Sequence, residues 1–282
     1  MNKNIRALVE ACDELAIKYE IASKTGNLIN LLINHKNYLF INWSTPLDNV
    51  SGSQLCQDKA YFYEFFNAII SIPTTAVILD PDCNKNYHHY LIDNNLKSMI
   101  STIETSLNYP LIVKPNKGCG GQGVFKVTRQ EEFIQAVTVI FNKNHRVYDY
   151  IALAQQYIMA QHEYRAIFVN STLVFAYEKN CLNADYKENL SPLHWEGSKA
   201  ELVTDQTILD TLQLFSNPLF DKLAIPYCGL DILVDSQQNY WLIEANSSPS
   251  YDFFIRDNGV SELKKMYLII IRSLINGYDL KA

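Results

Sequence analysis

The spacing of apolar residues along the chain predicts a mixture of helices and short strands. Helical periodicity runs through residues 4–17, 60–70, 91–107, 130–141, 207–223 and 261–275. Runs rich in β-branched and aromatic residues predict strands at 19–22, 28–33, 38–43, 110–114, 124–128, 151–156, 164–169, 173–177, 227–234 and 240–245. The strands at 110–114 and 124–128 flank a glycine-rich stretch, so we expect them to form a hairpin with a glycine tip.

A polar segment at 44–53, which contains Pro46, Gly52 and three serines, provides the best early boundary in the chain. Segments of this composition favour turns and linkers over regular elements. We therefore expect a short N-terminal unit over residues 1–54, followed by a larger folded region.

Charge and cysteine content exclude several classes of protein. The chain has 282 residues and a net charge of −6 at pH 7, so its overall field repels phosphate backbones and anionic lipid, and no nucleic-acid partner is expected. Its six cysteines include no Cys-x-x-Cys pair, which argues against a zinc ribbon or a disulfide scaffold and favours the cytoplasm. No charge-free apolar run reaches the length of a membrane span, so no membrane association is expected.

The glycine run Gly118, Cys119, Gly120, Gly121, Gln122 and Gly123 is the first candidate site. Its letters satisfy Gly-x-Gly-x-x-Gly, but a strand follows it and not a helix, and Val124 stands where a phosphate-binding Walker loop has lysine. With Lys114 just before it, the run suits a flap that covers a triphosphate through its backbone amides. A plain glycine-rich hairpin is the alternative. We expect Cys119, at the tip, to be exposed.

Two carboxylates and an amide form the second candidate site. Asp231 and Glu244 lie in apolar strands joined by a turn at 236–239, and folding the chain at Gln237 and Gln238 brings them together. Asn246 shares the face of Glu244 because strand residues alternate in direction. Oxygen ligands of this kind suit Mg²⁺ that also binds nucleotide phosphates. A solvated sheet edge is the alternative.

These motifs, in their order along the chain, resemble the ATP-grasp superfamily. The segments that carry the resemblance are Pro110–Pro115, Gly118–Gly123, Leu153–Ile158, Glu163–Arg165, Gly229–Asp231 and Leu242–Pro249. The pattern Asp185–Asn189, followed by His194 and Gly197–Ser198, is most similar to the branch of ribosomal-protein glutamate ligases and glutathione synthetases. The resemblance implies an α+β fold with two subdomains that clamp ATP, over residues 55–156 and 157–282, after the short N-terminal unit.

The resemblance also implies roles for single residues. Lys59 and Lys114 would hold the α- and β-phosphates, and Glu163 would bind the ribose hydroxyls. The adenine would lie against the hinge formed by Gln155, Gln156, Tyr157 and Ile158. The groups facing the γ-phosphate and the activated carboxylate would be Arg165, Lys179 and Asn189.

The implied cofactors are ATP and two Mg²⁺ ions, with Mn²⁺ as a substitute, bound by Asp231, Glu244 and Asn246. The implied activity is an ATP-dependent ligation of a carboxylate to an amine through an acyl phosphate, with ADP and phosphate released. Amino acids or peptides would be the substrates, and a homo-oligomer would be compatible with the short N-terminal unit. An ATP-grasp phosphotransferase and a nucleotide-binding regulator without turnover are the alternatives.

Two positions depart from the pattern of the superfamily. Gly229 stands where D-alanine ligases usually place an arginine for the oxyanion, so that activity is disfavoured. Ser250 replaces the usual glycine after Ser-Ser-Pro, which leaves the shape of the acceptor pocket open.

Overall fold

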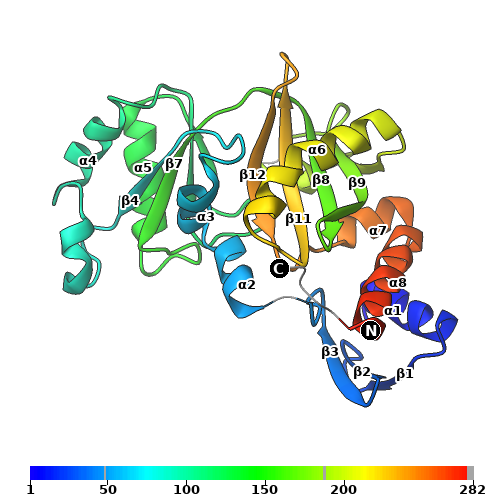
Figure 1. Ribbon diagram of the computed structural model, residues 1–282. Coiled ribbons are helices and arrows are strands. Elements are labelled where there is room, and N and C mark those ends of the chain that lie inside the picture. Colours follow the sequence, from blue (N-terminus) through cyan, green and yellow to red (C-terminus); the bar gives the residue numbers. More distant parts are fainter. Residues whose placement is uncertain (48, 187–188, 278–282) are drawn as a thin grey trace.

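The computed structural model describes residues 1–47, 49–186 and 189–277, which form two lobes and a smaller N-terminal unit (Figure 1). The helices are α1 (Lys3–Glu14), α2 (Val50–Gln57), α3 (Lys59–Phe66), α4 (Leu96–Ile103), α5 (Gln130–Phe141), α6 (Gln206–Lys222), α7 (Asp252–Asn258) and α8 (Ser261–Ile275), with short 3₁₀ helices η1 (Lys85–Tyr90) and η2 (Pro192–His194). The strands are β1 (Lys18–Ile21), β2 (Leu28–Ile33), β3 (Lys36–Ile41), β4 (Thr75–Leu79), β5 (Leu111–Pro115), β6 (Phe125–Val127), β7 (Ile151–Gln156), β8 (Ala160–Val169), β9 (Thr172–Asn180), β10 (Lys199–Leu202), β11 (Tyr227–Asp235) and β12 (Tyr240–Asn246).

The first lobe is a four-stranded antiparallel sheet in the order β4-β7-β5-β6. Helices α4 and α5 pack against it around a core that includes Phe133, Val137 and Ile140. Strands β5 and β6 are paired, and the glycine run connects them, so the predicted hairpin is confirmed.

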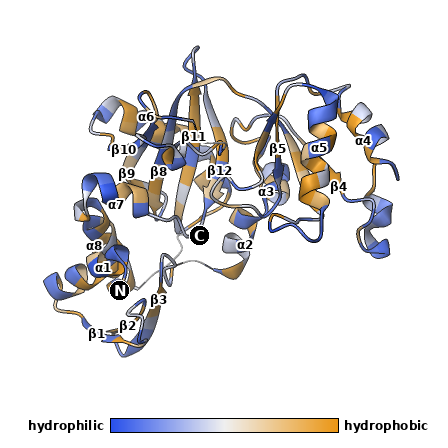
Figure 2. Cartoon of the chain, turned by 180° about the vertical axis from the view of Figure 1, so that it is seen from behind, coloured by the Kyte–Doolittle hydropathy of each residue, from blue (hydrophilic) through white to orange (hydrophobic). Residues whose placement is uncertain are grey.

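The second lobe is a five-stranded antiparallel sheet in the order β10-β9-β8-β11-β12. Apolar side chains of α6 and α3 cover one face of this sheet, and those of α7 and α8 contribute to a core on its other side. Hydrophobic colouring therefore concentrates on these strands and on α5, whereas the connecting loops are largely hydrophilic (Figure 2). Mixed helices and antiparallel sheets of this kind confirm the expected α+β class.

The N-terminal unit packs against the C-terminal helix. Strands β1, β2 and β3 form a small sheet, and α1 lies beside α8 in one continuous core that reaches Phe254 and Tyr267. Buried Asn4 connects the two parts, because its amide donates to the Asn42 carbonyl and its Oδ1 accepts from the Tyr267 hydroxyl at 2.8 Å. The division of the chain at residue 54 stays a prediction.

Several element boundaries differ from those predicted. The periodic stretch 91–107 is helical only from Leu96 to Ile103, because the Asn95 side chain accepts hydrogen bonds from two amides of the first turn and so starts the helix there. Part of the polar segment 44–53 belongs to α2, whose first turn is capped by Asn49. Strands β4 and β10 and helix α7 were not predicted; each is seven residues or shorter.

Within the described residues, no helix combines the length and apolar character needed to cross a lipid bilayer.

Candidate functional site

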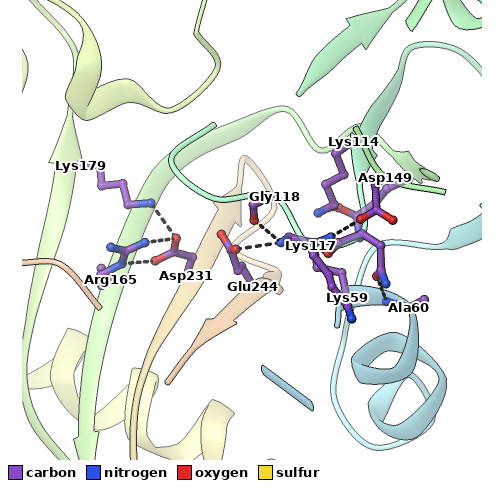
Figure 3. A network of polar contacts seen from close by, with 12 residues as sticks. Lys59, Ala60, Lys114, Lys117, Gly118, Asp149, Arg165, Lys179, Asp231 and Glu244 are labelled. Atoms are coloured by element: carbon purple, nitrogen blue, oxygen red, sulfur yellow. Dashed lines mark hydrogen bonds and ion pairs between the residues drawn. The ribbon is translucent and has the colours of Figure 1, made fainter. Parts of the chain in front are cut away.

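A row of charged side chains crosses one face of the five-stranded sheet, as Figure 3 shows. Arg165 on β8 and Asp231 on β11 are opposed in the strand register, and the guanidinium donates to both carboxylate oxygens at 2.6 Å. Lys179 on β9 donates to the same carboxylate at 2.9 Å. Asp231 is only 2% exposed, so this carboxylate depends on the two cations for its stability in the sheet.

The charges in this row stabilise one another against burial. Burial alone would raise the pKa of Asp231, but Arg165 and Lys179 hold it well below its usual range. Burial likewise opposes the charge of Lys179, yet Asp231 and Glu163 raise its pKa above the usual value. Burial also opposes the charge on Arg165, and Asp231 outweighs it and raises the pKa. All three groups are therefore ionised at neutral pH.

Glu163, expected at the ribose, belongs to the same network. Glu163 precedes Arg165 by two residues and lies on the same face of β8. Its Oε1 accepts a hydrogen bond from the Lys179 ammonium at 2.5 Å. Lys179 thus bridges Glu163 and Asp231.

Glu244 extends the row toward the first lobe. It is the register partner of Asp231 across the β11–β12 hairpin, so the predicted juxtaposition of the two carboxylates is confirmed. Its Oε1 lies 3.2 Å from the ammonium of Lys59, the first residue of α3. Lys59 in turn donates to the Gly118 carbonyl at 2.7 Å, which joins the acidic strand to the base of the glycine run.

Lys114 faces the same space from β5 and is 8% exposed. Its ammonium donates to the Gln155 side chain at 2.9 Å, and the Gln155 amide donates to Thr75 at 2.8 Å. Burial, together with the nearby charge of Lys59, lowers the pKa of Lys114 to about 8. A narrow pocket between the lobes is lined by Lys59, Lys114, Gln155 and Glu244, with apolar side chains that include Phe62 and Leu242.

The glycine run folds over this region and is held by Asn189. The Asn189 amide donates to the Gly120 carbonyl at 3.1 Å. Gly121 has a positive φ of 70°, and a Cβ there would lie 2.1 Å from Asn189 Oδ1, so only glycine permits this approach. Cys119 is exposed, as predicted. Lys187 and Glu188, which belong to the pattern that ends in Asn189, lie outside the described residues.

A family model for the RimK-like ATP-grasp domain matches residues 84–270. The chain belongs to the RimK-like ATP-grasp family. The match contains the glycine run, the charged row and the β11–β12 hairpin. The prediction of ATP-grasp membership is therefore confirmed.

Solved structures show the same fold at low sequence identity. A D-Ala:D-Ser ligase, VanG from Enterococcus faecalis, has a TM-score of 0.57 at 17% identity, over 81% of this chain and 64% of that one. A D-alanine--D-alanine ligase from Bacillus anthracis has a TM-score of 0.57 at 18% identity, over 80% of this chain and 70% of that one. The ATP-grasp ligase PsnB, complexed with minimal precursor, has a TM-score of 0.54 at 13% identity, over 81% of this chain and 63% of that one. The chain thus spans less than two thirds of the first and third structures. No curated protein sequence matches it.

In this ATP-grasp domain, the expected adenine hinge connects the two lobes. Gln155 and Gln156 end β7, and Tyr157 and Ile158 precede β8. The backbone amide of Gln156 donates to the Thr74 carbonyl, and the Tyr157 ring lies 3.9 Å below the Lys126 ammonium. Gln155 directs its side chain to Lys114 and not outward.

The donor set of the domain fits a divalent cation at β11 and β12. No group of three or more His, Cys, Asp or Glu side chains assembles as a metal site in the described part of the chain, so an amide oxygen is required to complete a set. Asn246 lies two residues beyond Glu244, and its buried Nδ2 has no hydrogen-bond partner among the described residues, which leaves this amide free to reorient toward a ligand. Glu244 forms an ion pair with Lys59 and keeps 24% of its side chain exposed. A cation bound by Asp231 would share the carboxylate oxygens with the hydrogen bonds from Arg165 and Lys179.

Sequence reasoning did not identify Asn116, which positions the start of α3 and the Lys59 side chain through hydrogen bonds. It is fully buried directly after Lys114 and Pro115, and its Oδ1 accepts from the Ala60 amide in the first turn of α3. Its backbone carbonyl also accepts from Lys59 at 3.4 Å. The only signal for this role was its position between the strand and the glycine run.

Sequence reasoning also did not expect the contacts that fix the loop after β12. The hydroxyls of Ser247 and Ser53 lie 2.9 Å apart, as do those of Ser248 and Ser44. These pairs attach the loop to α2, which contains Ser53, and to Ser44 after β3.

Proposed function

We propose that this protein is an ATP-dependent ligase that joins a carboxylate to an amine. The reaction would pass through an acyl phosphate and release ADP and phosphate. The observation that supports it best is the charged row from Lys179 to Glu244, which continues through Lys59 to the glycine run. Such a row brings cations and carboxylates to the face where a nucleotide triphosphate would lie between the lobes.

The cations would neutralise charge during phosphoryl transfer. Lys59 and Lys114 would bind the α- and β-phosphates, and Arg165 and Lys179 would face the γ-phosphate as it moves to the substrate carboxylate. Asn189 would orient the activated carboxylate, because its amide already lies against the glycine run. Glu163 would bind the ribose, in exchange for its contact with Lys179, and the hinge Gln155–Ile158 would hold the adenine.

Asp231, Glu244 and Asn246 would hold two Mg²⁺ ions, with Glu244 shared between them. When bound, such ions supply charge neutralisation at the bridging phosphate oxygens. The protein would contribute the closed glycine run, which excludes water that hydrolyses an acyl phosphate. Binding of ATP would require Lys59 to exchange part of its present contact with Glu244 for phosphate oxygens.

The acceptor side differs from that of a D-alanine ligase. A Cβ on Gly229 would lie 3.1 Å from Pro249 and 3.2 Å from Ile167, so an arginine there would require these neighbours to shift by a few tenths of an ångström. This supports a substrate pair other than two D-alanines, drawn from amino acids or peptides.

Heavy-oxygen labelling tests the ligase reaction. A substrate carboxylate labelled with ¹⁸O should transfer one labelled atom to inorganic phosphate for each amide formed, because the amine displaces the phosphate at the carbonyl carbon. The screen would pair ATP with mixtures of amino acids and short peptides. A phosphotransferase would leave the phosphate on the substrate, and a regulator would not consume ATP. Amide product with unlabelled phosphate would contradict the acyl-phosphate route.

A further inference from the structure

His194 lies between the glycine run and the start of α7. It ends η2, and its Nε2 is 3.9 Å from the position that a Cβ on Gly120 would occupy at the tip of the glycine run. Its ring packs edge-on against Phe253 at the start of α7, with centroids 5.0 Å apart and an interplanar angle of 82°. His194 is exposed to solvent, and its Nε2 lies beside the glycine run, so solvent can reach the imidazole next to the run.

Amide formation requires a proton acceptor at this approach. An amine is an ammonium ion at neutral pH, and its nitrogen has no lone pair for attack until a proton leaves. Arg165 and Lys179 are cations and cannot accept it, and Asp231 is held by both of them. The His194 side chain has no hydrogen bond or ion pair with other described residues, so its basic nitrogen is free to act.

The surroundings of His194 keep its imidazole neutral. Partial desolvation, and after it the charge of Lys179 on β9, lower the pKa of His194. On α7, Arg256 lies 5.2 Å from the Phe253 ring against which the imidazole packs, and it pairs with Asp257. Ionisable groups that follow it closely in the chain or lie in the glycine run include Glu196 and Cys119.

We propose that His194 is the general base that deprotonates the acceptor amine. This role rests on the proposed ligase function. The acceptor ammonium transfers one proton to Nε2, and the nitrogen lone pair forms the C–N bond to the acyl phosphate. The bond from the carbonyl carbon to the phosphate oxygen then breaks with its electron pair. The second proton leaves the nitrogen to the released phosphate, and the imidazolium returns its proton to solvent.

Hydroxylamine separates this role from the rest of the reaction. It is neutral at pH 7 and attacks an acyl phosphate without a base, whereas an amino acid needs one. We would incubate the full chain with MgATP and a mixture of amino acids and short peptides, and measure hydroxamate with hydroxylamine present and amide without it. We expect His194→Gln to keep hydroxamate formation within about twofold and to lower amide formation by about 10²-fold to 10⁴-fold. The deficit in amide should shrink as pH rises, because more of the amine is then already deprotonated.

His162→Gln is the matched control, because His162 is also a partly exposed histidine. It lies on β8 and pairs with Glu178 on the neighbouring strand β9. It should leave both products unchanged. Equal loss of hydroxamate and amide in His194→Gln, or no loss of either, would overturn the role of His194. Absence of hydroxamate and amide from the unchanged protein would instead count against the ligase function itself.

Discussion

Arg165 and Asp231 occupy opposed positions on β8 and β11 and are joined by two hydrogen bonds of 2.6 Å. The fork of the guanidinium fixes the plane of the carboxylate, and Lys179 also donates to Oδ2, the oxygen that accepts from Arg165 Nη2. One buried carboxylate is therefore oriented by two cations before any ligand binds. Nucleotide and metal would meet a site whose charges are already positioned.

Removal of the Asp231 charge should destabilise the fold. Asp231→Asn leaves Arg165 and Lys179 without their shared carboxylate, and breaking a buried pair of this kind costs about 3–5 kcal/mol in the free energy of unfolding. Urea denaturation at neutral pH measures this loss. Asp231 has a lowered pKa in the folded state, so its contribution is complete above the ordinary range for aspartate and is lost only as pH falls through the folded-state value. A loss below about 1 kcal/mol would contradict the buried network.

ATP binding should weaken above pH 8 because of Lys114. Its folded-state pKa is about 8, and the neutral amine cannot neutralise a phosphate. Affinity for a non-hydrolysable ATP analogue should fall by up to about tenfold per pH unit above this value. The free energy of unfolding should rise over the same pH range, because above pH 8 the unfolded chain binds more protons at Lys114 than the folded chain does. Lys114→Arg should reduce the pH dependence of binding, and an unchanged profile would separate Lys114 from the phosphates.

Glu244→Gln should keep the fold and lower turnover by about 10²-fold to 10³-fold, the effect of removing one key electrostatic contact. Glu244 is the carboxylate proposed to contact both metal ions, and the amide keeps its shape but not its charge. Rates of ADP release at saturating Mg²⁺ measure the effect. Glu178→Gln provides the control, because Glu178 lies on β9 and pairs with His162. Near-normal turnover in Glu244→Gln would remove it from the metal site.

Cys119 should report closure of the glycine run. It is exposed, and its neighbours are held by Lys59 and Asn189. A thiol reagent should modify Cys119 quickly in the free protein and slowly with MgATP, because the run would then cover the phosphates. Mass spectrometry of a Cys181→Ser background isolates the signal, since Cys181 is the other thiol that is not buried. Equal rates with and without MgATP would place the run outside the nucleotide site.

Periodicity and pairing rules predicted most of the elements around the site. The helices at 130–141 and 261–275 and the strand at 151–156 have the predicted bounds. The turn at 236–239 was sufficient to predict that Asp231 and Glu244 are opposed, because a hairpin fixes its own register. These features depend on residues close together in sequence.

The contacts between distant segments could not be predicted in this way. The hydrogen bonds that Lys179 forms with Glu163 and Asp231 depend on the order of three strands, β9-β8-β11, in one sheet. The attachment of Asn189 to Gly120 joins residues 69 positions apart and requires the loop before η2 to cross the glycine run. No local pattern encodes these pairs, because they depend on strand order within one sheet and on how a distant loop meets the glycine run.

The shared core of α1 and α8 has a consequence for where the backbone can be interrupted. Helix α1 contacts α8 through buried side chains, and the Glu14 carboxylate lies 2.7 Å from the Lys264 ammonium. The fragment that precedes α2 is therefore held by packing as well as by the peptide chain. A cut at the peptide bond between residues 49 and 50, at the start of α2, should leave two pieces that co-purify, and the same pieces expressed separately should reassemble by complementation.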